Sequence, residues 1–134
     1  MAEKKNQLLK ISLVLFAISM LGYGIIYLFF PEWEIKSSGS VAFPAGWIRF
    51  FGSVYLALGI GSIMVFRNPS KQGIFITAMC IGTFLQGLTL IYTVLFEYEE
   101  MGNIWRTLIP AFYLLILSVL FFISLKKSKE ILWE

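Results

Sequence analysis

The segment 104-IWRTLIPAFYLLILSVLFFISL-125 contains one charged residue, Arg106, in twenty-two positions. A helix needs about 20 predominantly apolar residues to cross a hydrocarbon core that is about 30 Å thick. Because lipid offers the backbone no hydrogen-bond partner, such a segment has to pair its own N–H and C=O groups, as a helix does. The stretch therefore predicts a transmembrane helix over residues 104–125.

Three further runs of the same kind precede it, over residues 11–30, 47–66 and 73–96. They are too long and too continuous for the strands of a membrane barrel. The connections 67–72 and 97–103 are short enough to make consecutive helices antiparallel neighbours. Only 31–46 is long enough to carry structure of its own, but its serine-rich stretch 37-SSGS-40 is typical of a flexible segment, so we expect a plain external loop there. We therefore expect one all-α membrane domain over residues 1–134, an antiparallel bundle of four transmembrane helices.

The overall composition supports this fold class. The chain is 58% hydrophobic and 14% charged, with a mean hydropathy of +0.80, whereas soluble domains are about 45–50% apolar and about 25% charged. A soluble fold of this size buries too small a fraction of its surface to hide the excess. The net charge of +3 comes from basic residues in short clusters between apolar runs, so we expect no nucleic-acid partner.

The distribution of Lys and Arg predicts the orientation, because cytoplasmic flanks are enriched in both. Both termini and the 67–72 connection share eight of them: Lys4, Lys5, Lys10, Arg67, Lys71, Lys126, Lys127 and Lys129. The other side has at most Lys36, Arg49 and Arg106. We therefore place both termini in the cytoplasm. The first run is longer than a signal-peptide core and lacks the small residues of a cleavage site, so we expect it to be retained.

Several kinds of chemistry are excluded by residues that the chain lacks. It contains no His and no Asp, which removes His-based metal sites, His general bases and Ser-His-Asp catalysis. Its single cysteine, Cys80, cannot form an intramolecular disulfide and is interpreted as a small packing residue. The remaining Glu, Tyr and Ser side chains form no recognisable nucleophile–base pair. We expect no enzyme, no cofactor and no metal.

Polar side chains within spans normally face the bundle interior or water. In the third helix, one stripe at helical intervals contains Gly82, Thr83, Gln86, Thr93 and Glu97. In the second helix, Arg49 begins a ridge of small residues spaced four apart: Ser53, Ala57 and Gly61. Most polar groups lie in the outer half, which predicts a cavity open to the outside. The candidate ligand-binding residues are Tyr23, Tyr27, Arg49, Gln86, Thr93, Glu97, Arg106 and Tyr113.

The two arginines of this set begin helices on the outer side. A cation gains nothing from the partly positive helix N-terminus, so a glutamate, a headgroup or a ligand has to stabilise it. We expect Arg49 to point inward and pair with Glu97, and Arg106 to pair with Glu32 or Glu97. The alternative is that both arginines extend to lipid headgroups, or pair with Glu32 and Glu97, while the other polar groups only join helices.

A possible internal repeat relates residues 22–34 to residues 87–99, with five of thirteen positions identical. Each segment is followed by a helix that begins with Trp and Arg. A duplication would produce two similar hairpins related by an axis along the membrane normal. Chance similarity between apolar segments is the alternative.

Three short motifs carry a family resemblance: 27-YLFFPE-32, 49-RxxGxxxLALGI-60 and 67-RNP-69. Together they resemble the small, functionally uncharacterised four-helix bacterial membrane proteins of the BphX-like and DoxX-like kind. The resemblance implies a four-helix architecture in a bacterial cytoplasmic membrane. It implies no catalytic or binding residues.

Three classes of function follow, in decreasing order of expectation. The first is a non-enzymatic membrane protein that binds a lipid-like or small amphipathic ligand in the outer cavity, or serves as an accessory subunit, with membrane lipids and a second copy as expected partners. The second is a small oligomeric transporter or channel. The third, a membrane enzyme, is the least expected because His and Asp are absent.

Overall fold

The computed structural model describes residues 2–39, 44–97 and 103–134. These residues form helices and no strand, so the predicted all-α class is confirmed. The helices are α1 (Ala2–Phe29), α2 (Pro31–Ser38), α3 (Ala45–Arg67), α4 (Gly73–Phe96), α5 (Trp105–Lys127) and α6 (Lys129–Trp133).

Four of these helices, α1, α3, α4 and α5, are long and apolar enough to cross a membrane. The four apolar runs of the sequence lie over them. The ends of each run differ from the helix ends by at most two residues, except that α1 begins well before residue 11. The short helices α2 and α6 are additions to the predicted architecture, in which residues 31–46 form a plain loop and residues 126–134 a tail.

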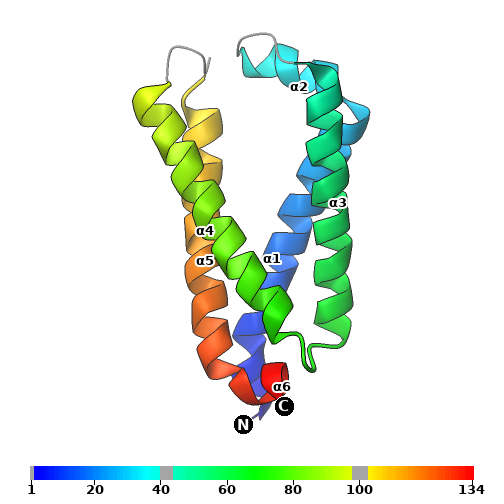
Figure 1. The fold of residues 1–134 in the computed structure, drawn as a ribbon, viewed down its shortest axis with the longest axis vertical. Coiled ribbons are helices and arrows are strands. Elements are labelled where there is room, and N and C mark those ends of the chain that lie inside the picture. Colours follow the sequence, from blue (N-terminus) through cyan, green and yellow to red (C-terminus); the bar gives the residue numbers. More distant parts are fainter. Residues whose placement is uncertain (1, 40–43, 98–102) are drawn as a thin grey trace.

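The long helices are arranged as two pairs, α1 with α3 and α4 with α5 (Figure 1). The pairs meet mainly through α1 and α5, at the end that carries both termini and the turn at residues 68–72. We call this the convergent end. The pairs move apart toward the opposite, divergent end, where α2 lies beside the start of α3 (Figure 1).

A buried apolar core occupies the convergent half. Its innermost members include Leu13, Phe16, Ile76, Leu117 and Phe121, and the rings of Phe16 and Phe121 meet edge to face with centroids 5.7 Å apart. Helix α6 closes this end, with a buried Leu132 and with Trp133 packed against Gly73. The core therefore holds the two helix pairs together from one end.

Buried hydroxyl groups link the helices within this core. Ser62 of α3 donates to the carbonyl oxygen of Leu13 in α1 at 2.9 Å, and Ser118 of α5 donates to that of Cys80 in α4 at 3.1 Å. The Cys80 thiol in turn donates to the Ser118 carbonyl oxygen at 3.4 Å. Each bond joins two different helices at a depth where water is scarce, so these polar groups favour one packing arrangement over its alternatives.

The ridge predicted along α3 is wrong for two of its members. Ser53 and Ala57 are exposed, and the residues that face α1 are Gly52 and Gly59. A Cβ atom on Gly52 would lie 2.6 Å from the backbone nitrogen of Leu28, so only glycine permits this approach. Small residues occupy more than one face of α3, and four-residue spacing alone does not distinguish these faces.

The internal repeat stays a prediction, and its two aligned glycines, Gly22 and Gly87, lie in different environments. A Cβ on Gly22 would meet nothing within 4 Å, whereas one on the aligned Gly87 would lie 2.7 Å from the Leu115 side chain. Two aligned positions, Tyr98 and Glu99, lie outside the described residues.

Candidate functional site

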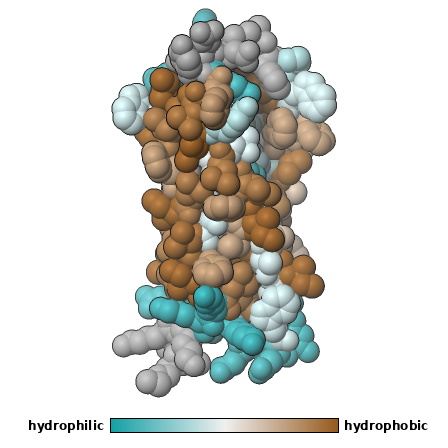
Figure 2. Space-filling model, turned by 60° about the vertical axis from the view of Figure 1, so that its left-hand side comes forward, coloured by the Kyte–Doolittle hydropathy of each residue, from teal (hydrophilic) through white to brown (hydrophobic). Residues whose placement is uncertain are grey.

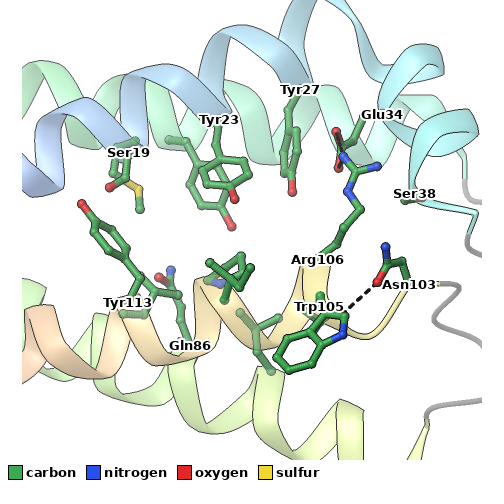
Figure 3. Close-up of a pocket in the computed structure, with 17 residues that line it drawn as sticks. Ser19, Tyr23, Tyr27, Glu34, Ser38, Gln86, Asn103, Trp105, Arg106 and Tyr113 are labelled. Carbon is green, nitrogen blue, oxygen red and sulfur yellow. Dashed lines mark hydrogen bonds and ion pairs between the residues drawn. The ribbon is translucent and has the colours of Figure 1, made fainter.

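A cavity of about 530 Å³ lies between the two helix pairs, toward the divergent end (Figure 3). This volume falls within the range of small-molecule binding sites. All four long helices and α2 contribute to its walls. The polar and aromatic lining residues are Ser19, Tyr23, Tyr27, Glu34, Ser38, Tyr55, Gln86, Asn103, Trp105, Arg106, Thr107 and Tyr113.

The structure brings five of the eight candidate residues to this cavity: Tyr23, Tyr27, Gln86, Arg106 and Tyr113. The other three, Arg49, Thr93 and Glu97, do not line it. Arg49 belongs to the exposed face of α3, together with Ser53 and Ala57. Thr93 lies on α4 beyond Gln86 and Leu90, its two lining residues, and Glu97 directly follows this helix, where α4 has moved away from α1.

One wall of the cavity is aromatic. The rings of Tyr23 and Tyr27 in α1 lie edge to face at 5.7 Å between centroids, and Tyr27 lies at the same distance from Tyr55 of α3. Sequence reasoning missed Tyr55. It stands between Gly52 and Gly59, so a glycine stripe of that spacing would have identified its face of α3 as the one directed at α1.

At the inner end of the cavity, the Tyr113 hydroxyl of α5 donates to the carbonyl oxygen of Leu15 in α1 at 2.7 Å. This bond joins the two helix pairs where they begin to separate. Gln86 of α4 faces the cavity beside Tyr113 (Figure 3). Pro110 also lines it and cannot donate a hydrogen bond to the carbonyl oxygen one turn earlier, at Arg106.

At the outer end, Arg106 of α5 reaches across to α2. Its guanidinium Nη2 lies 3.2 Å from Oε2 of Glu34, and Nη1 donates to the Ser37 hydroxyl at 3.0 Å. The exposed fractions of the two charged side chains are 35% for Arg106 and 18% for Glu34. This contact joins the two helix pairs at the end where they are farthest apart.

Helix α2, which positions Glu34, replaces the loop expected at residues 31–46. Pro31 occupies the first helical turn, Glu32 and Glu34 complement its positive end, and Lys36 complements the last turn. Gly39 ends the helix in the left-handed conformation, with φ 68°. These are ordinary helix start and stop signals, and they outweigh the serine-rich stretch that begins at Ser37.

The predicted pairings of both arginines are wrong. Arg49 pairs with Glu32 at 2.7 Å, as the alternative interpretation allowed, and not with Glu97; its side chain is 49% exposed instead of pointing inward. Arg106 pairs with Glu34 instead of Glu32 or Glu97. The reason is α2, which places two glutamates beside the starts of both α3 and α5.

The two ion pairs are expected to differ in strength. A double-mutant cycle on Arg49→Ala and Glu32→Ala should give a coupling of at most about 1 kcal/mol, because both groups are solvated. The cycle on Arg106→Ala and Glu34→Ala should give about 1–3 kcal/mol, because Arg106→Ala leaves a largely buried carboxylate without its cation. Chemical unfolding of the purified protein in detergent measures both. A coupling for the second pair no larger than for the first would show that Glu34 is solvated.

Comparisons with known proteins add no further constraint. No protein family, curated protein or solved structure matches the chain. The resemblance to BphX-like and DoxX-like membrane proteins therefore stays a prediction.

Proposed function

We propose that this chain is a multi-pass protein of a bacterial cytoplasmic membrane that binds a lipid-like or small amphipathic molecule in the cavity at its divergent end. In this proposal the four long helices form an antiparallel transmembrane bundle, and the convergent end lies in the cytoplasm. The protein is a binding protein or an accessory subunit and not an enzyme.

Membrane insertion is supported by the surface. Figure 2 shows a band of apolar side chains across the middle of this face of the molecule and polar ones gathered at the convergent end. Large apolar side chains such as Ile18, Met64, Ile74 and Ile116 are 60–76% exposed. Water would penalise this surface at about 25 cal/mol per Å², whereas lipid would not.

A ligand is supported chiefly by one observation: polar side chains face a cavity between helices whose outer surfaces are apolar. The side chains of Tyr23, Tyr27, Tyr55 and Gln86 make no hydrogen bond to any other residue that the structure describes. Polar groups at this depth normally mark a water-filled path or a ligand site. A molecule with a polar head and an apolar body would satisfy both the polar groups and the apolar walls.

Occlusion of the cavity tests this proposal. Ser19→Phe places a ring in the cavity and should abolish co-purification of an amphipathic molecule, as measured by native mass spectrometry of the detergent-solubilised protein. The matched control is Ser53→Phe, since both hydroxyls donate to the carbonyl oxygen three residues earlier in a helix, but Ser53 is exposed outside the cavity. Equal ligand content in the two variants would contradict a site in this cavity.

The proposed orientation has a separate test. In a Cys80→Ser background, a cysteine at Lys36 should react with an impermeant maleimide on intact cells, whereas cysteines at Ser70 or Lys129 should react only after permeabilisation. All three positions are accessible at the surface. Labelling at Ser70 but not at Lys36 would invert the topology.

A further inference from the structure

The charged groups of the cavity balance one another. Among the described lining residues, the only charged side chains are Glu34 and Arg106, and they pair at 3.2 Å. The guanidinium is held further by the Ser37 hydroxyl. An anionic headgroup would therefore meet the Glu34 carboxylate next to the cation, and a cationic one would meet the guanidinium. Either would leave a charge uncompensated in a poorly solvated site, which is costly.

The groups available to bind a ligand are neutral. The Gln86 amide and the hydroxyls of Tyr23, Tyr27 and Tyr55 are unpaired within the described part of the chain. In Tyr27, Tyr55 and Gln86, no fully buried polar side-chain atom lacks a hydrogen-bond partner, so their unpaired polar atoms remain accessible. Figure 3 shows Tyr23 and Tyr27 projecting from α1 into the cavity, and Gln86 on the opposite wall. Together they offer several donors and acceptors to one molecule.

The rest of the lining suits a hydrocarbon chain. Met20, Leu90, Ile109, Pro110 and Leu114 supply apolar wall, and the tyrosine rings add flat apolar faces. The cavity thus combines neutral hydrogen-bonding groups with an apolar surface and has no net charge.

Resting on the proposed function, we infer that this cavity selects lipids whose headgroup is uncharged and carries hydroxyl and ester oxygens, as in a diacylglycerol. Such a headgroup accepts from the tyrosine hydroxyls and the Gln86 amide and donates to their oxygens. It leaves the Arg106–Glu34 pair intact. A phosphate headgroup has to compete with Glu34 for the guanidinium, so it binds more weakly.

The experiment compares three probes on the full-length protein in detergent micelles by native mass spectrometry. These are dioleoylglycerol, dioleoylphosphatidic acid with the same acyl chains, and free glycerol. Dioleoylglycerol should bind roughly tenfold or more tightly than phosphatidic acid, because disrupting one hydrogen bond to a charged group costs a factor of about this size. Free glycerol should not compete at equal concentration, because it lacks the apolar part.

Variants assign the selectivity to named groups. Gln86→Leu should weaken dioleoylglycerol binding several-fold. Glu34→Gln removes the balancing charge, so it should reverse the preference toward phosphatidic acid. Its matched control is Glu32→Gln, which removes the carboxylate from the exposed pair with Arg49 and should leave the preference unchanged. The double variant Glu34→Gln with Arg106→Gln restores neutrality and should restore the preference for dioleoylglycerol, which separates an effect of charge from a folding defect.

The outcomes distinguish this inference from the function on which it rests. Wild-type protein that prefers phosphatidic acid, or Glu34→Gln with an unchanged preference, would overturn the headgroup assignment and leave lipid binding in place. Free glycerol that competes as well as dioleoylglycerol would overturn the lipid part. Failure of the wild-type protein to bind either lipid, with no amphipathic molecule co-purifying with it, would overturn the proposed function itself.

Discussion

Phe121→Ala is expected to lower the free energy of unfolding by about 2–3 kcal/mol. Phe121 is fully buried in the core at the convergent end, against Phe16 of α1. In water-soluble proteins the removal of such a ring costs about 3–5 kcal/mol, from transfer of the ring and from the cavity that it vacates. In the proposed transmembrane bundle the surrounding lipid is as apolar as the core, so the transfer contribution shrinks and the packing contribution remains.

The control for this variant is Phe112→Ala on the same helix. Phe112 is 56% exposed and does not line the cavity, so its removal should change stability by no more than about 0.5 kcal/mol. Chemical unfolding of both variants in one detergent gives the comparison. Equal effects at the two positions would mean that α5 presents a different face to α1.

Gly52→Ala is the second variant with a large expected effect, a decrease in stability of about 1–3 kcal/mol. The added methyl group would lie 2.6 Å from the Leu28 backbone nitrogen and 3.0 Å from the Gly24 carbonyl oxygen. No side chain can move to relieve a contact with backbone, so α1 and α3 have to separate, as in other overpacked interfaces.

The matched control is Gly22→Ala on α1, where a Cβ would meet nothing within 4 Å. Alanine favours a helix over glycine by about 1 kcal/mol at either position, so this gain cancels in the comparison. Gly22→Ala should be as stable as the wild type or more stable. If Gly52→Ala had the same melting temperature as Gly22→Ala, the close contact of α1 with α3 would not exist.

Much of the candidate site was accessible from the sequence, because polar residues in apolar helices are rare and conspicuous. Tyr23, Tyr27, Gln86, Arg106 and Tyr113 are identified in this way, and all line the cavity. Arg49 and Glu97 satisfy the same criterion, since both are charged and lie toward the divergent end of the molecule, yet neither lines the cavity. The depth of a residue within the bundle is thus easier to infer than the direction in which its side chain points, because depth depends only on position along a helix.

The partners of charged groups were not accessible in the same way. Sequence reasoning missed Glu34 as the partner of Arg106, since its position depends on α2 folding over the divergent end. The start and stop signals of α2, from Pro31 to Gly39, are present in the sequence and could have predicted a helix there. Even with that helix recognised, its direction relative to α5 depends on how the two helix pairs diverge.

The sequence by itself determined the all-helical class and the positions of four helices long enough to span a membrane. These follow from the length and hydropathy of each segment, which are local properties that do not depend on the neighbouring helices. Only the tertiary structure decided which face of α3 meets α1, which glutamate meets Arg106, and that the two pairs meet at one end and enclose a cavity toward the other. The rotation of a helix about its axis is decided by how it packs against all its neighbours, and the sequence of one segment does not specify those neighbours.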